Sequence, residues 1–149
     1  MAESELTENK YIVFQLGDQL LAVPLMSANE VMECGDVRPV SRSKQFFNGV
    51  TNIRGEVVGV IDLRQRFDLE SAEGASVLMV FEFPDYTLAA KVDRLVRVDE
   101  VDDSEIDPVR GVKNYVDGCY VQGMYERDGE MITVIDIKAF LNDDRVIAA

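Results

Sequence analysis

The sequence predicts a mainly β protein made of two similar five-stranded barrels packed side by side, with a few short helices. Short apolar and β-branched runs flank turn residues in pairs, which is typical of β-hairpins. A β unit of about 65 residues also occurs twice along the chain. The chain has 149 residues, of which 47% are hydrophobic, so it is long and apolar enough to form a real core.

Four hairpins account for most of the expected strands. Their turns contain Gly, Pro or Asp, which suit tight reversals of the backbone. The paired runs are residues 11–16 with 19–23, 49–53 with 56–62, 76–83 with 86–92, and 120–125 with 131–137. Short helical segments are expected at residues 43–47, 63–67 and 137–141.

The repeat is visible in two ungapped alignments. Residues 13–23 match residues 80–90 at an offset of 67, with five identities in eleven positions. Residues 49–62 match residues 123–136 at an offset of 74, with six identities in fourteen positions. Each copy is expected to close as a barrel, because closure removes unpaired sheet edges. Because so small a unit is marginal alone, the two barrels should pack together and leave a groove and two outer ends as contact surfaces.

Charged residues invert between the two copies. Glu30 aligns with Arg97, and Arg54 aligns with Asp128. This pattern predicts an ion pair between Glu30 and Arg54 in the first copy and a reversed pair between Arg97 and Asp128 in the second. The alternative is four unrelated surface charges. An exposed pair contributes only about 0–1 kcal/mol, so its importance would lie in positioning.

The turn around Arg54 combines a structural and a recognition signal. Gly55 lies between two apolar runs, where glycine adopts a positive φ at little cost, and Gly129 repeats it. Arg54 has no cationic counterpart in the second copy, so it is not part of the shared scaffold. It is therefore the best single candidate for a recognition residue.

Composition excludes several classes of function. The chain has no histidine, which rules out Ser-His-Asp and Cys-His catalysis and histidine metal sites. Its 15 basic and 28 acidic residues give a net charge of −13, which disfavours binding to nucleic acid or anionic membranes. No apolar run is long enough to span a membrane, and the acidic start predicts no secretory signal. A cytoplasmic protein with protein partners is expected.

No catalytic residue, metal ligand or cofactor is assigned. Glycine-rich nucleotide-binding motifs are missing, and the acidic residues 99–107 lack the glycine of an EF-hand loop, so a solvated strand end is favoured. Cys34 and Cys119 are interpreted as small core residues, with a disulfide left open. Asp62 and Asp136 each precede a short helical segment, where Asp commonly caps helix amides. A carboxylate-based acid-base enzyme is the alternative for this pair.

Residues 47–67, with the sequence FNGVTNIRGEVVGVIDLRQRF, resemble the signature segment of CheW-type chemotaxis coupling proteins. The resemblance extends over about residues 11–141. It implies a single domain of two intertwined SH3-like barrel subdomains, with repeat units at about residues 11–70 and 77–141. A flexible acidic N-terminus is expected at residues 1–10 and a C-terminal tail at residues 142–149. The sequence departs from the family at Gly59, where a proline is common, and it lacks a second proline after Pro39.

The resemblance implies a non-catalytic adaptor without a cofactor. Such proteins join the cytoplasmic tips of chemoreceptors to the regulatory domain of a CheA-type histidine kinase, and the isolated protein is expected to be a monomer. Alternatives are a scaffold in a chemosensory pathway that controls pili or gene expression, or a detached regulatory module of a kinase. The residues implied for the receptor are Ala28, Glu30, Val31, Asn52 and Arg54, and those implied for the kinase, at an apolar barrel end, are Val37 and Val40.

Overall fold

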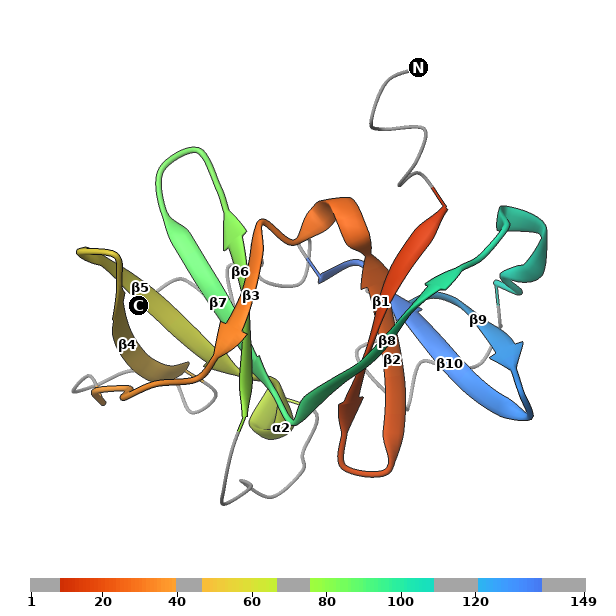
Figure 1. The fold of residues 1–149 in the computed structure, drawn as a ribbon, viewed down its shortest axis with the longest axis horizontal. Coiled ribbons are helices and arrows are strands. Elements are labelled where there is room, and N and C mark those ends of the chain that lie inside the picture. Colours follow the sequence, from red (N-terminus) through yellow and green to blue (C-terminus); the bar gives the residue numbers. More distant parts are fainter. Residues whose placement is uncertain (1–8, 40–46, 67–75, 109–120, 138–149) are drawn as a thin grey trace.

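The computed structural model describes residues 9–39, 47–66, 76–108 and 121–137. These segments are mainly β structure, as predicted, and form two five-stranded sheets that lie side by side (Figure 1). The strands are β1 (Lys10–Leu16), β2 (Gln19–Pro24), β3 (Glu30–Glu33), β4 (Phe47–Ile53), β5 (Glu56–Asp62), β6 (Val77–Glu82), β7 (Thr87–Val92), β8 (Arg94–Glu100), β9 (Val121–Arg127) and β10 (Glu130–Ile135).

Each sheet contains strands from both halves of the chain. One has the order β3-β6-β7-β5-β4 and is called the first barrel; the other has the order β8-β1-β2-β10-β9 and is called the second barrel. The expectation that each sequence repeat closes on itself is therefore corrected, because the two copies exchange their first hairpins. In this arrangement β1 and β2 pair with strands of the second copy, and β6 and β7 pair with strands of the first.

The sequence repeat corresponds to an internal two-fold relation between the barrels. Glu30 is opposite Val80 in the first barrel, and its repeat counterpart Arg97 is opposite Val13 in the second. The register shift between Phe47 and Gly49 recurs at the equivalent place in β9. In each barrel a short bridge also connects the segment after one edge strand to the other edge strand. This bridge helps to close each sheet into a barrel.

The hairpin turns follow the predicted chemistry. Arg54 and Gly55 have φ values of 53° and 84°, and Asp128 and Gly129 have values of 54° and 82°. Two successive residues with positive φ match the twist of the flanking strands. The positive φ expected for both glycines is confirmed.

The core has one shared part and two separate parts. The largest cluster of buried side chains takes Phe14 and Leu16 from the second barrel and Phe81 and Ile61 from the first. Each barrel also has a smaller cluster of its own. Because the largest apolar cluster spans both sheets, the barrels are expected to stabilise each other.

Helical structure is limited. The helix expected at residues 63–67 is present as α2 (Leu63–Arg66), and two 3-10 turns, η1 (Leu25–Ser27) and η2 (Asp103–Glu105), follow β2 and β8. The helices expected at residues 43–47 and 137–141 fall mainly outside the described residues, except that Phe47 begins β4. Most of the expected N-terminal segment, the C-terminal tail and Cys119 also lie outside them. Cys34 is a free thiol that packs against the separate core of the first barrel.

Candidate partner-binding surface

An ion pair joins the two edge strands of the first barrel. Glu30 begins β3, and Arg54 lies in the turn between β4 and β5. The Arg54 guanidinium donates a hydrogen bond to Glu30 Oε1, which confirms the predicted pair. The Arg54 side chain is 74% exposed, so solvent screens the pair and its contribution to stability is small. Its main effect is to fix a cationic group on the barrel surface.

Asn52 holds the turn that carries Arg54. The Asn52 side-chain oxygen accepts a hydrogen bond from the Gly55 N–H at 2.9 Å. Asn and Asp often stabilise turns in this way, by satisfying a backbone N–H that the reversal leaves unpaired. Asn52 therefore supports the turn, and both Asn52 and Arg54 are exposed to solvent.

The other residues implied for the receptor lie before and within β3. Ala28 follows η1, and Val31 follows Glu30 on the opposite face of the strand. Both pack, partly buried, against the core shared by the two barrels. The structure thus brings Glu30 and Arg54 into contact, whereas Val31 is directed toward the core. The sequence prediction missed Met26, which lies in η1 and is 64% exposed.

The reversed ion pair predicted for the second barrel is wrong. Arg97 does not pair with Asp128; its Nε lies 2.8 Å from Asp99 Oδ1, and a terminal nitrogen lies 4.0 Å from Glu130. Asp99 is two residues along the same strand, so its side chain lies on the same face as Arg97. Arg97 therefore pairs within its own strand and not with the turn residue that corresponds to Arg54.

Asp99 and Tyr125 form a buried polar contact in the second barrel. The Tyr125 hydroxyl donates to Asp99 Oδ2 at 2.8 Å. Burial raises the pKa of Asp99, but hydrogen bonds from Arg97 and Tyr125 outweigh it, and the pKa lies below its ordinary value. Burial and the same bond raise the pKa of Tyr125. The expectation that the acidic stretch is a solvated strand end therefore fails at Asp99, which is 6% exposed.

We expect Asp99→Asn to destabilise the protein by about 2 kcal/mol at neutral pH, because the Arg97 charge loses a buried partner. A depressed pKa in the folded state contributes stability above the unfolded value, near pH 4, and this stability is lost as pH falls through the folded value. The difference between wild type and variant should thus shrink below about pH 4. Urea titrations at several pH values measure it; a difference independent of pH contradicts the assignment.

The end of the first barrel has an open hollow of about 560 Å³ between β3, β4 and the segment after β3. Met32 and Thr51 line it. At the repeat offsets, their counterparts in the second barrel are Asp99 and Tyr125, whose side chains are buried and hydrogen-bonded to each other. The two barrel ends therefore differ at these positions, and the end of the first barrel has a concave surface of mixed apolar and polar lining.

Val57 is an exposed apolar residue at this end of the first barrel. It is 69% exposed and lines both the hollow beside Thr51 and a second hollow of about 530 Å³ beside Tyr86. Sequence reasoning missed Val57, although strand alternation was a usable signal, because Val58 and Val60 are buried and Val57 must point outward. Val37 packs against the core of the first barrel instead of lining the hollow. Val40 lies outside the described residues.

The interpretation of Asp62 as a helix cap is confirmed. Asp62 Oδ1 accepts a hydrogen bond from the Arg64 N–H at 3.0 Å, at the start of α2. Asp62 ends a strand of the first barrel, whereas Asp136 follows a strand of the second. In the described part of the chain, no group of three or more His, Cys, Asp or Glu residues could hold a metal ion. No helix there is long and apolar enough to cross a membrane.

Two intertwined SH3-like barrels, one with a solvent-facing ion-paired turn and an open end, define a protein of the double-barrel type. A family model described as a CheW-like domain matches residues 10–145. The chain therefore belongs to the CheW-like family of chemotaxis adaptor proteins.

Similar proteins carry chemotaxis names. The chemotaxis protein CheW of Treponema pallidum is 26% identical over 132 residues, which cover 85% of this chain and 78% of that protein. The chemotaxis protein CheW of Thermotoga maritima is 25% identical over 139 residues, covering 93% and 91%. The crystal structure of the scaffolding protein TtCheW from Thermoanaerobacter tengcongensis superposes with a TM-score of 0.78 at 25% identity, covering 87% of this chain and 84% of that one.

Proposed function

We propose that this protein is a non-catalytic adaptor that couples the cytoplasmic tips of chemoreceptors to the regulatory domain of a CheA-type histidine kinase. The observation that carries the proposal is the Glu30–Arg54 pair on a turn held by Asn52, within a chain that belongs to the CheW-like family. This arrangement presents one fixed guanidinium to a partner and needs no cofactor. The adaptor acts in the cytoplasm, at the membrane arrays formed by its receptors.

The receptor is proposed to contact the edge of the first barrel formed by Met26, Ala28, Glu30 and Arg54. This edge combines an exposed apolar side chain with an oriented ion pair. Such a mixture of an apolar contact and charged groups at its margin suits a reversible protein interface. The ion pair restricts the Arg54 side chain, so less conformational entropy is lost when a partner binds.

We expect Arg54→Ala to weaken receptor binding by at least about tenfold while leaving the fold intact, because it removes the oriented cation and little stability. Co-sedimentation with assemblies of a receptor cytoplasmic domain measures the loss. Asp128→Ala is the matched control, since Asp128 occupies the equivalent turn position with nearly the same φ. Full receptor binding by folded Arg54→Ala would remove Arg54 from the proposed surface.

The kinase regulatory domain is proposed to bind the open end of the first barrel, around Val57 and the two hollows. An apolar side chain that is 69% exposed between two concave surfaces is suited to insertion of a partner's apolar groups. The turn residue Arg54 and Val57 are only three positions apart in the chain. The two proposed surfaces therefore share the β4–β5 hairpin.

Titration calorimetry with the regulatory domain of the CheA-like kinase from the same source tests the adaptor function directly, and saturable 1:1 binding is expected. Val57→Lys should weaken this binding by at least about tenfold, because it places a charge in an apolar contact. Met131→Lys is the control, since Met131 is the repeat counterpart of Val57 and is also exposed. No binding of wild type at tens of micromolar contradicts the proposal of a kinase partner.

A further inference from the structure

One residue separates the two barrels where the chain passes from β7 to β8. This residue, Asp93, follows the last residue of β7 in the first barrel and precedes the first residue of β8 in the second. Its backbone N–H donates to the carbonyl oxygen of Gln15 in β1 at 3.1 Å. The backbone of this crossover is thus already attached to the second barrel.

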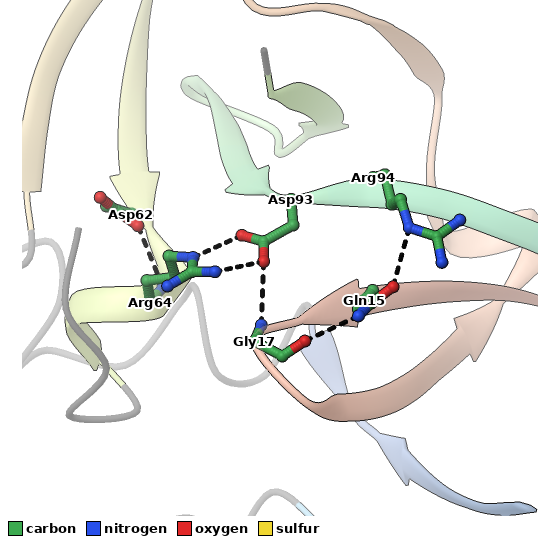
Figure 2. A network of polar contacts seen from close by, with 6 residues as sticks. All are labelled: Gln15, Gly17, Asp62, Arg64, Asp93 and Arg94. Carbon is green, nitrogen blue, oxygen red and sulfur yellow. Dashed lines mark hydrogen bonds and ion pairs between the residues drawn. The ribbon is translucent and has the colours of Figure 1, made fainter. Parts of the chain in front are cut away.

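The Asp93 carboxylate contacts both barrels at once (Figure 2). Arg64, in α2 at the end of the first barrel, donates from Nε to Oδ1 and from a terminal nitrogen to Oδ2, each at 2.5 Å. Gly17, in the β1–β2 turn of the second barrel, donates its N–H to Oδ2 at 2.9 Å. A bidentate pair of this kind restricts direction as well as distance.

Both partners of Asp93 are themselves held in place. The Arg64 backbone N–H is bound by Asp62, and the Gly17 carbonyl oxygen accepts a hydrogen bond from Gln15 Nε2 at 2.7 Å. Gln15 in turn accepts a hydrogen bond from Arg94 at 2.8 Å through its Oε1. Arg64 and Gly17 are thus held by other hydrogen bonds besides those to Asp93. A small rotation of one barrel against the other would therefore strain several bonds at once.

The carboxylate is charged at neutral pH. Burial raises the pKa of Asp93, but hydrogen bonds from Arg64 and Gly17 outweigh it and hold the pKa below its ordinary value. The Arg64 and Asp93 side chains are about a fifth exposed, at 21% and 20%, so water screens their attraction only in part.

The shared apolar core holds the barrels together through the area that it buries, and a bidentate ion pair adds a specific direction to that packing. At the other crossover, from β2 to β3, the repeat counterpart of Asp93 is Met26, an exposed apolar residue in η1. Among the described residues, the ionic contact is thus found at the β7–β8 crossover and not at Met26, and it adds a directional constraint there.

We propose that Asp93 is a positioning residue that fixes the orientation of the second barrel relative to the first by joining Arg64 to the β1–β2 turn. Its consequence for function rests on the proposed adaptor role: the second barrel is held at a constant position beside the receptor and kinase surfaces of the first. The residue acts through this geometry and contacts no partner itself.

Electron spin resonance distance measurements on the free, full-length protein test the orientation. Spin labels are placed at the exposed positions Glu82 in β6 and Glu126 in β9, in a background with Cys34→Ser and Cys119→Ser. The labelled protein that retains Asp93 is expected to give one narrow distribution of distances between the two labels. Asp93→Asn, which has nearly the same shape but no charge, is expected to broaden or displace it. An unchanged distribution overturns the proposal.

Asp99→Asn is the matched control for loss of stability. Asp99 is also an ion-paired carboxylate, and a more buried one than Asp93, but its partners Arg97 and Tyr125 both belong to the second barrel. The distribution should stay narrow in this variant, and equal broadening would overturn the specific role of Asp93. If Asp93→Asn does not fold, Arg64→Gln removes the same link from the other side and carries the same expectation.

Calorimetry with the kinase regulatory domain tests the functional consequence separately. If wild type binds, Asp93→Asn should bind more weakly than Asp99→Asn. Equal affinity despite an altered distance distribution overturns the functional consequence alone. If wild type itself does not bind the kinase domain, the proposed function fails, while the distance measurement still decides the role of Asp93.

Discussion

Gly49→Ala is expected to destabilise the protein by more than about 3 kcal/mol, although it adds a single methyl group. A Cβ atom at Gly49 would lie 2.1 Å from the carbonyl oxygen of Arg38 and 2.7 Å from its carbonyl carbon. Both are backbone atoms of the bridge between Arg38 and Val50, which helps to close the first barrel, so no flexible side chain can move aside. The φ of 144° adds conformational strain for any residue with a Cβ.

Urea denaturation of Gly49→Ala and Gly55→Ala separates the two causes. Gly55 also has a positive φ, at 84°, but nothing lies within 4 Å of a Cβ built there. Replacing Gly55 by alanine should cost only about 1 kcal/mol, the usual penalty for a residue with a Cβ atom in the left-handed conformation. If Gly49→Ala costs no more than Gly55→Ala, close contact with Arg38 is not what requires glycine at this position.

Phe14→Ala is expected to cost about 3–5 kcal/mol and to weaken both barrels together. Phe14 belongs to β1 of the second barrel, is fully buried, and lies in the cluster that also contains Phe81 and Ile61 of the first barrel. A cavity in this shared cluster removes contacts on both sides. Unfolding should therefore remain a single transition at a lower urea concentration.

Hydrogen exchange followed for β1–β2 and β6–β7 checks this prediction. Protection should fall by a similar free energy in both hairpins, because they open in the same global event. Ile132→Ala is the comparison variant, since Ile132 lies in the separate core of the second barrel. Loss of protection confined to β1–β2 in Phe14→Ala would show that the barrels unfold independently.

Several features of the candidate surface followed from local sequence alone. The Arg54–Gly55 turn was predictable because two residues between apolar runs must reverse the chain, and glycine tolerates a positive φ. The Glu30–Arg54 pair was predictable from opposite charges on two segments of one repeat unit. The corresponding prediction of an Arg97–Asp128 pair was wrong, because Asp99 is a nearer partner: it lies two residues from Arg97 on the same face of the strand.

The open barrel end and the contact at Asp93 could not be predicted from neighbouring residues in the sequence. The hollow lies beside Thr51, whose larger repeat counterpart Tyr125 bonds Asp99 in the second barrel, and that contact joins residues 26 positions apart. Asp93 meets Gly17 across 76 positions and Arg64 across 29. No periodicity or turn signal in the sequence refers to such distant partners.

The sequence by itself determined the strands, their hairpin turns, the two-fold repeat and the family resemblance, because these depend on alternation, turn chemistry and short spacing. The tertiary structure decided which strands share a barrel. The repeats exchange their first hairpins, and this exchange places Phe14 and Phe81 in one core and Asp93 between the barrels. The physical reason is that each hairpin carries the same local pattern, so its partner is chosen by long-range packing and burial and not by its own sequence.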